Sequence, residues 1–170
     1  MEKSITTALF IVVSMILALM LFNVAYPAVT EGGDAVVSMA NDVAERMRYD
    51  IEIIHASAEL DDSGWWQDFN GNGQFDVNVW VKNIGDERII GLDRVDVFFG
   101  REGNFARIAY VDEASGSYPN WTATVENGAD WNPTGTLRIT IRYQAPLTRG
   151  RYFVKVILPN GISSEYFLGI

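Results

Sequence analysis

One uncharged stretch decides the fold of this chain: Ile5-Thr-Thr-Ala-Leu-Phe-Ile-Val-Val-Ser-Met-Ile-Leu-Ala-Leu-Met-Leu-Phe-Asn-Val-Ala-Tyr26. At about 1.5 Å of rise per residue, a helix of this length reaches across the roughly 30 Å hydrocarbon core of a bilayer. Such an apolar surface needs shelter from water. The sequence leaves two kinds of shelter open, a lipid bilayer or the packed interior of an assembly built from many copies of the same helix.

A cleaved secretory signal is the alternative interpretation of this stretch. Signal peptides have a basic start, an apolar region of about 7–15 residues and a small-x-small cleavage site. Here the apolar run is longer and ends in Tyr26-Pro27, so we expect the helix to be retained. The polar Asn23 and the small Ala25 and Ala28 leave cleavage open.

The apolar stretch is expected to continue into a second, amphipathic helical part. Pro27 removes a backbone donor and Gly32-Gly33 adds freedom, which predicts a kink or partial unwinding between Pro27 and Gly33. From Asp34 onward, apolar residues recur every three to four positions. Residues 1–50 are therefore predicted to form one arm, and the apolar positions of its second part are Val36, Val37, Ala40, Val43, Ala44, Met47 and Ile51.

Bulky side chains at helical spacing in the first part of the arm are the candidates for contact between helices. The sequence predicts that they form the core of an assembly or the surface of a membrane anchor. These predicted assembly residues are Ile5, Leu9, Phe10, Val13, Ile16, Leu17, Met20, Leu21 and Val24.

Residues 51–170 are predicted to form a separate β-sandwich head. In the clearest strand, Phe75–Asn83, apolar and polar residues alternate, so one face packs and the other faces out. Turn-rich pieces separate the strands, and no convincing helix follows residue 50. We expect an α+β chain, a long N-terminal helix followed by an immunoglobulin-like sandwich. The other expected strands are 51–60, 94–99, 105–111, 121–125, 137–143, 152–158 and 164–168.

Charge and composition narrow the classes of function. The net charge of −9 and the pI near 4.5 argue against a nucleic-acid partner, which would require a basic face. Cysteine is absent, and His55 is the single histidine. The chain carries no Gly-x-Ser-x-Gly elbow, phosphate-binding loop or dinucleotide fingerprint. We therefore expect a protein that is not an enzyme.

A polar segment ahead of the clearest strand has the spacing of a calcium-binding loop. Asp68-Phe-Asn-Gly-Asn-Gly-Gln-Phe-Asp76 places oxygen-bearing groups at alternate positions and glycine at the sixth, as in the first half of an EF-hand loop. Position twelve is Val79, so another acid such as Asp61 or Asp62 would have to complete the site. Asn-Gly-Asn-Gly is also typical of a simple tight turn. The predicted calcium ligands are Asp68, Asn70, Asn72, Gln74 through its carbonyl, and Asp76.

One glycosylation sequon has a permitted middle residue, Asn120-Trp-Thr122. If the head is exported, Asn120 is the predicted glycan acceptor.

The order of parts resembles the archaellins, or archaeal flagellins, and the related archaeal type IV pilin-like proteins. The unit Val79-Trp-Val-Lys-Asn-Ile-Gly85 followed by Leu92-Asp-Arg-Val-Asp-Val-Phe98 is similar to the V-K-N-x-G and D-V-F pattern of archaellum sandwich domains. The hairpin of Gly150-Arg-Tyr-Phe-Val-Lys-Val156 and Asn160-Gly161 fits the same pattern. The resemblance implies an extracellular filament at the cell surface, with helices bundled inside and sandwiches outside.

Two features depart from that family. Its precursors carry a short charged leader before the apolar run, whereas here Met1-Glu-Lys alone precedes Ser4. Pilins also present a glutamate early in the mature chain, and Glu2 is the one acid nearby. Whether Met1 is encoded or created by processing stays open.

The leading hypothesis is a motility filament subunit that is membrane-inserted before assembly and polymerises with copies of itself. The resemblance further implies an archaellum assembly platform as partner. The alternatives are a membrane-anchored accessory or stator protein that binds the cell envelope through the sandwich, and an adhesive pilin. A third hypothesis, a membrane-anchored carbohydrate-binding module, predicts that Trp65, Trp66 or Trp121 lines a glycan groove.

Overall fold

The structure is a computed structural model that describes the backbone of residues 2–170 and the side chains of residues 5–44 and 48–170. The expectations for the side chains of Glu2 and Met47 lie outside these described residues. The chain divides into two compact units, and the division falls between Glu45 and Arg46. Each unit is described by itself.

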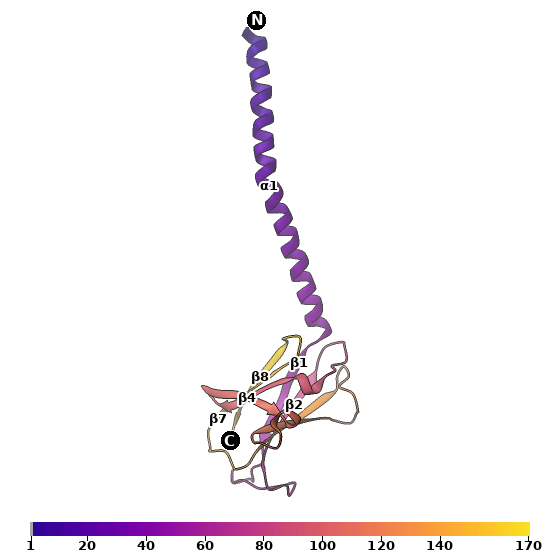
Figure 1. Cartoon of the computed structure of the whole chain (residues 1–170), viewed down its shortest axis with the longest axis vertical. Helices are drawn as coiled ribbons and strands as arrows, with labels where there is room; N and C mark the ends of the chain where they lie inside the picture. The colour runs from indigo at the N-terminus through magenta and orange to yellow at the C-terminus, as the bar shows by residue number, and fades with distance from the viewer. Residues whose placement is uncertain (1) are drawn as a thin grey trace. The chain divides into compact units, whose positions relative to one another are not determined.

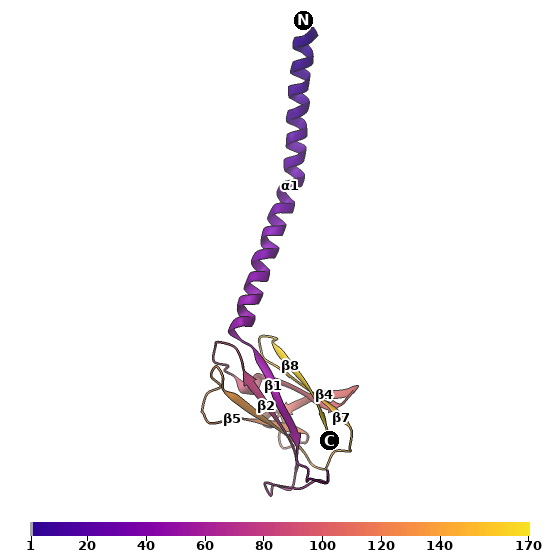
Figure 2. The ribbon, with the colours of Figure 1, turned by 180° about the vertical axis from the view of Figure 1, so that it is seen from behind.

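The first unit is made by helix α1, which runs without interruption over Glu2–Arg48 and contains Pro27. The sequence predicted a kink or a partial unwinding between Pro27 and Gly33. The backbone stays helical there, and the ribbon changes direction about midway along α1 (Figure 1; seen from behind in Figure 2). Proline removes one hydrogen bond and crowds the preceding turn, which a helix can absorb by bending.

Eight strands build the second unit, and all eight were predicted. Two short helices that the sequence did not predict, η1 (Leu92–Arg94) and α2 (Val111–Ala114), connect strands. The strands are β1 (Ile51–Ala58), β2 (Phe75–Asn83), β3 (Asp96–Arg101), β4 (Asn104–Tyr110), β5 (Asn120–Val125), β6 (Thr136–Tyr143), β7 (Arg151–Ile157) and β8 (Ser163–Gly169).

The strands form a nearly closed sandwich in the order β1-β2-β6-β5-β4-β3-β7-β8. The only parallel pairing among the described strands is the short one between β4 and β5, which joins the two layers at one side. At the other side, the Ile53 amide on β1 donates a hydrogen bond of 3.0 Å to Ser164 Oγ on β8. The predicted fold, a long helix followed by a sandwich, is confirmed.

The core lies between the layers and follows the alternation read from the sequence. Phe75, Val77, Val79 and Val81 on β2 are fully buried, as are their counterparts on the facing layer. Full burial of each such side chain contributes about 1.5–3 kcal/mol. The facing core residues are Val97, Phe99, Val154 and Val156.

The buried side-chain amide of Asn83, at the end of β2, holds the turn after β2 and the segment around Trp131 together. Its Nδ2 donates to the carbonyl oxygens of Glu87 (2.9 Å) and Trp131 (3.3 Å), and its Oδ1 accepts from the Gly85 amide (3.0 Å). A buried amide with its hydrogen bonds made fixes the backbone around it. The Asn-Ile-Gly part of the motif that carried the family resemblance therefore has a structural role.

Candidate functional site

The surface of α1 is the first candidate site. The nine predicted assembly residues of the sequence analysis are 44% to 76% exposed. Apolar residues between them, including Ile11, Met15, Leu19 and Phe22, are exposed as well, so the apolar surface surrounds the helix. By length and composition, Ile5–Ala44 could cross a membrane, and no part of its most apolar window is buried.

Two hydroxyl side chains of α1 make their hydrogen bonds within the helix. Ser14 Oγ donates to the Phe10 carbonyl (2.7 Å), and Thr30 Oγ1 donates to the Tyr26 (3.1 Å) and Pro27 (2.9 Å) carbonyls. Such hydroxyls need no water, which suits a helix surrounded by lipid or by other helices.

The predicted calcium loop forms a tight turn around Asp68. The Asp68 carboxylate accepts backbone hydrogen bonds from Gly71 (2.7 Å), Asn72 (3.3 Å) and Gly73 (2.8 Å). These bonds, that from Gly73 foremost, lower the pKa of Asp68. Gly71 and Gly73 adopt positive φ of 72°, as the turn requires. The requirements of the turn therefore explain most of the residue types in this loop without a bound metal.

The tight turn does not explain why the carboxylates of Asp76 and Glu59 are buried beside it. Asp76 is 2% exposed, and its Oδ2 accepts from Asn70 Nδ2 (2.9 Å) and Asn72 Nδ2 (3.0 Å). Asp76 Oδ1 and Glu59 Oε2 are buried without a hydrogen-bond partner. Burial, followed by the charge of Asp76, raises the pKa of Glu59. Two unpartnered carboxylate oxygens are thus enclosed beside the loop.

Glu59, an acid that the sequence analysis did not suggest, lies beside this loop. Asp61 Oδ1 accepts from the Ser63 (2.9 Å) and Trp65 (2.8 Å) amides, so it serves a separate turn. Glu59 borders the same cavity as Asp76, and its amide donates to the Asp76 carbonyl (3.0 Å). Over the described residues, no group of three or more His, Cys, Asp or Glu side chains is gathered as for a metal.

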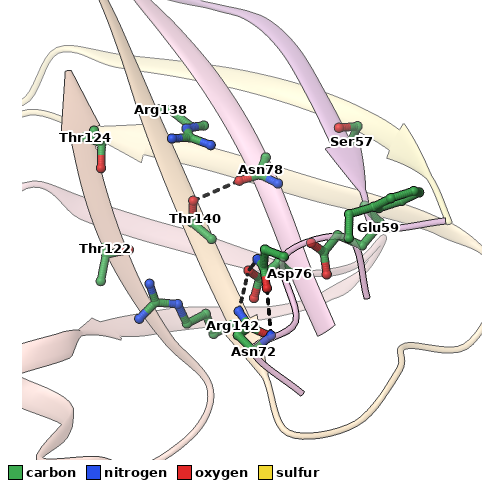
Figure 3. Close-up of a pocket in the computed structure, with 13 residues that line it drawn as sticks. Ser57, Glu59, Asn72, Asp76, Asn78, Thr122, Thr124, Arg138, Thr140 and Arg142 are labelled. Carbon is green, nitrogen blue, oxygen red and sulfur yellow. Dashed lines mark hydrogen bonds between the residues drawn. The ribbon is translucent and has the colours of Figure 1, made fainter. Parts of the chain in front are cut away.

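A polar cavity of about 480 Å³ opens beside these carboxylates on the outer face of β2, β6 and β5 (Figure 3). Phe69 of the loop borders it, and Thr140 Oγ1 donates to Asn78 Oδ1 (2.8 Å) within it. The sequence analysis missed this cavity. A usable signal was the run of polar residues that alternates with the core positions of β6, namely Arg138, Thr140 and Arg142.

A second, more apolar cavity of about 360 Å³ is lined by Trp65 and Trp66. The Arg149 guanidinium lies 5.4 Å from the centre of the Trp65 ring, and its Nη2 donates to the Ser63 (3.0 Å) and Gly64 (3.1 Å) carbonyls. A cation already covers one face of that ring.

Trp121 cannot line a groove. It is 1% exposed, and its Nε1 donates to the Ile108 carbonyl (3.1 Å) inside the core. Of the three tryptophans suggested for a glycan groove, the structure brings together Trp65 and Trp66.

The predicted glycan acceptor Asn120 stands at the start of β5 and is 3% exposed. Its Nδ2, the atom that would carry the sugar, donates to the Ser117 carbonyl (2.8 Å). Glycosylation at Asn120 stays a prediction, and it would require this bond to open.

Comparisons with known proteins give two kinds of similarity. No family model matches the chain. An uncharacterized protein from Archaeoglobus fulgidus is 25% identical over 174 residues, which cover 98% of each chain.

Solved structures that share the fold include two of archaellum stator proteins and one of an archaeal flagellin. The archaellum periplasmic stator protein FlaG from Sulfolobus acidocaldarius has a TM-score of 0.54 at 24% identity, covering 71% of this chain and 99% of FlaG. The FlaF–FlaG stator complex from the same organism gives 0.53 at 24%, covering 70% and 88%. Archaeal flagellin FlaB1 from Methanocaldococcus jannaschii gives 0.51 at 11%, covering 71% and 89%. At these identities the similarity shows the fold, and it confirms the resemblance to archaellins at that level.

Proposed function

We propose that this chain is a structural, non-catalytic subunit of an archaellum-like extracellular filament, polymerising through α1 and serving motility. The observation that carries the proposal is the apolar surface of α1, which is exposed around the helix and has no partner within the described chain. The fold shared with an archaeal flagellin supports the same role.

Association energetics favour α1 as the polymerising element. Burying about 1,000 Å² of its apolar surface would contribute about 25 kcal/mol. Association costs on the order of 4–15 kcal/mol. This surplus keeps an assembled subunit from dissociating into water. In lipid the apolar surface is already sheltered, so close packing between helices must favour the bundle over the bilayer. The small side chains of Thr7, Ser14 and Ala18 border a shallow groove along the helix together with larger apolar ones, and small side chains allow close helix packing.

Contacts between α1 helices of successive copies can extend into a filament. Because the apolar surface surrounds α1, different sides of the helix can contact different copies. Such contacts are heterologous, and heterologous contacts extend into filaments when the rotation does not close. Before assembly, the bilayer shelters the same surface. An archaellum assembly platform would then transfer the helix from lipid into the bundle.

The second candidate function is a membrane-anchored accessory or stator protein of the archaellum. The fold similarity to FlaG, at higher identity than that to FlaB1, favours it. In this case α1 stays in the bilayer, and the sandwich contacts the cell envelope. An adhesive pilin has the same architecture as the first candidate and differs in what its outer surface binds.

Electron microscopy of sheared cell-surface material separates the two candidates. The filament proposal expects filaments whose mass is mainly this chain, decorated along their length by antibodies against the sandwich. Recovery of the chain only in the membrane fraction, as a monomer or small oligomer that requires detergent, would contradict it and support the stator candidate.

We also propose that the loop Asp68–Asp76 binds calcium, with Glu59 in the place of the missing acid. The unpartnered oxygens Asp76 Oδ1 and Glu59 Oε2 support this, because buried carboxylate oxygens without donors are suitable ligands for a hard cation. The predicted ligand Gln74 would contribute its backbone carbonyl. Bound calcium would offset the repulsion between these acids and stiffen the loop.

A further inference from the structure

We infer that the cavity on the outer face of β2, β6 and β5 binds a neutral, hydroxyl-rich ligand, a pyranose residue of a glycan. The inference uses the side chains that border the cavity and does not depend on whether the chain is a filament subunit or a stator. It also places the sugar away from the tryptophan-lined cavity suggested by the sequence.

Hydrogen-bonding groups without partners border this cavity. Asp76 Oδ1 and Glu59 Oε2 are buried acceptors, and Arg142 Nε is a buried donor; none has a partner within the described residues. Leaving such a group unpaired costs about 1–3 kcal/mol. Arg142 stands opposite Asp76 in the β2–β6 register, yet its side chain extends toward Thr122 on β5 (Figure 3). The donor and the acceptors therefore face the cavity rather than one another.

Asn78 and Thr140 add a further donor and a further acceptor to this cavity. The single proton of the Thr140 hydroxyl is donated to Asn78 Oδ1 at 2.8 Å. Because that carbonyl oxygen accepts, the Asn78 amide group remains as a donor and the Thr140 oxygen as an acceptor. Both residues border the cavity, which thus presents donors and acceptors side by side.

The mixture of charges selects the class of ligand. An anion would meet the carboxylates of Asp76 and Glu59, and an organic cation would meet the guanidinium of Arg142. The positive charge of Arg138 is offset by Glu126, whose Oε1 lies 3.0 Å from Arg138 Nε. A hydroxyl group both donates and accepts, so a neutral polyol can satisfy all of these groups without burying an additional charge.

Phe69 provides the apolar surface that a sugar ring requires. Its side chain borders the cavity and is 62% exposed, so the ring is accessible to a ligand there. The C–H face of a pyranose can pack on such a ring while its hydroxyls meet the polar strands. The volume of about 480 Å³ lies within the range of about 300–1,000 Å³ typical of small-molecule sites.

Saturation-transfer NMR on the full chain tests this inference. The protein is held in micelles of an amine-oxide detergent, which has no sugar head group. Methyl α-mannoside, methyl β-glucoside and N-acetylglucosamine are the neutral probes, and glucuronate and inorganic phosphate are the anionic ones. Each is measured with calcium and with a chelator. We expect transfer to at least one neutral sugar with the chelator, at an affinity on the order of 1 mM, and weaker transfer with calcium, which would occupy the same two carboxylate oxygens.

Two variants locate the sugar, because neither residue belongs to the proposed calcium ligands. Phe69→Ala and Arg142→Ala should each weaken binding about five- to tenfold, corresponding to roughly 1–1.4 kcal/mol. Trp65→Ala is the matched control, since Trp65 is similarly exposed, at 69%, and borders the other cavity. Circular dichroism shows whether each variant retains the fold.

Four results would overturn the inference. They are no transfer to any neutral sugar, binding of the anions alone, transfer that requires calcium, and a loss in Trp65→Ala that equals the loss in Phe69→Ala. The third result would mean that the carboxylates do not accept from the sugar directly. Failure here would leave the filament and stator candidates untouched, since microscopy tests those separately.

Discussion

Gly85 lies directly against the backbone of Arg48: a Cβ placed on Gly85 would stand 2.6 Å from the Arg48 carbonyl oxygen. The Gly85 amide also donates to the Asp50 carbonyl (3.2 Å), and the Glu87 amide donates to that of Arg48 (2.9 Å). These bonds tie the segment that leads into β1 to the turn after β2. No side chain fits between the two segments, so the turn requires glycine for space rather than for an unusual φ.

Gly85→Ala should therefore destabilise the sandwich by about 2–3 kcal/mol, because the turn must move and strain its hydrogen bonds. Denaturant unfolding of the full chain in detergent, followed by near-UV circular dichroism of the tryptophans, measures the loss. Gly169→Ala is the control, since a Cβ there meets nothing within 4 Å, and it should change stability by less than about 0.5 kcal/mol. Equal stability of the two variants would refute the steric explanation.

The sequence predicted the strands well because their alternation is local. Phe75, Val77, Val79 and Val81 alternate with polar residues, and burial of one face follows from that period alone. The short helices η1 and α2 escaped prediction because three or four residues carry no period. The role of Gly85 was also hidden, since its neighbour Arg48 is distant in sequence and only the folded chain brings them together.

The polar cavity shows where local periodicity fails. Asp76 alternates with core residues of β2 and was expected to face solvent, yet it is buried because Asn70 and Asn72 of the preceding loop fold over it. Glu59 lies just after β1, and the path of the loop from β1 back to β2 likewise determines that it stands beside Asp76. Sequence spacing could identify the loop, but it could not identify the acid that completes its surroundings.

Calcium should stabilise the sandwich if the loop binds it. At a calcium concentration one hundred times the Kd, the stabilisation is about 2.7 kcal/mol, so a chelator should lower the melting temperature by several degrees. Asp76→Asn and Glu59→Gln should reduce this difference, whereas Asp61→Asn, which alters a separate turn, should preserve it. Calorimetric melting with calcium and with chelator measures the effect. Identical melting of the wild type in both would count against the site.

Tyr143 should make the sandwich sensitive to alkaline pH. Burial, followed by the charge of Tyr152, raises the pKa of Tyr143 to about 12 from the ordinary 10.0. The folded state therefore favours the neutral phenol. Its contribution to stability is fully present below pH 10 and is lost as the pH rises toward 12.

Tyr143→Phe keeps the ring, which packs 6.0 Å from that of Phe99, and removes the ionisable group. The unfolding free energy of this variant should fall less steeply between pH 10 and pH 12 than that of the wild type. Denaturant unfolding at several pH values measures both slopes. Identical slopes for Tyr143→Phe and the wild type would show that Tyr143 ionises equally in both states.

Leu17→Lys distinguishes a helix that assembles from one that only anchors. A lysine near the middle of a membrane span costs about 2.5–3.5 kcal/mol, while each Leu, Ile, Phe or Val contributes about −0.3 to −0.6 kcal/mol. The remaining apolar residues of Ile5–Ala44 are numerous enough for the variant to insert. In a bundle of α1 helices, however, a charge is buried in every subunit and has no lipid interface toward which to extend.

The filament proposal therefore expects Leu17→Lys to remain in the membrane fraction but to give no filaments, while Leu17→Ile assembles normally. Fractionation and electron microscopy of the same cells measure both properties. Normal filaments from Leu17→Lys would rule out a bundle core at this position. If both the wild type and the variant are found in the membrane and neither forms filaments, the result would support the stator candidate instead. The exposed apolar helix has two available environments, and this single substitution is tolerated in only one of them.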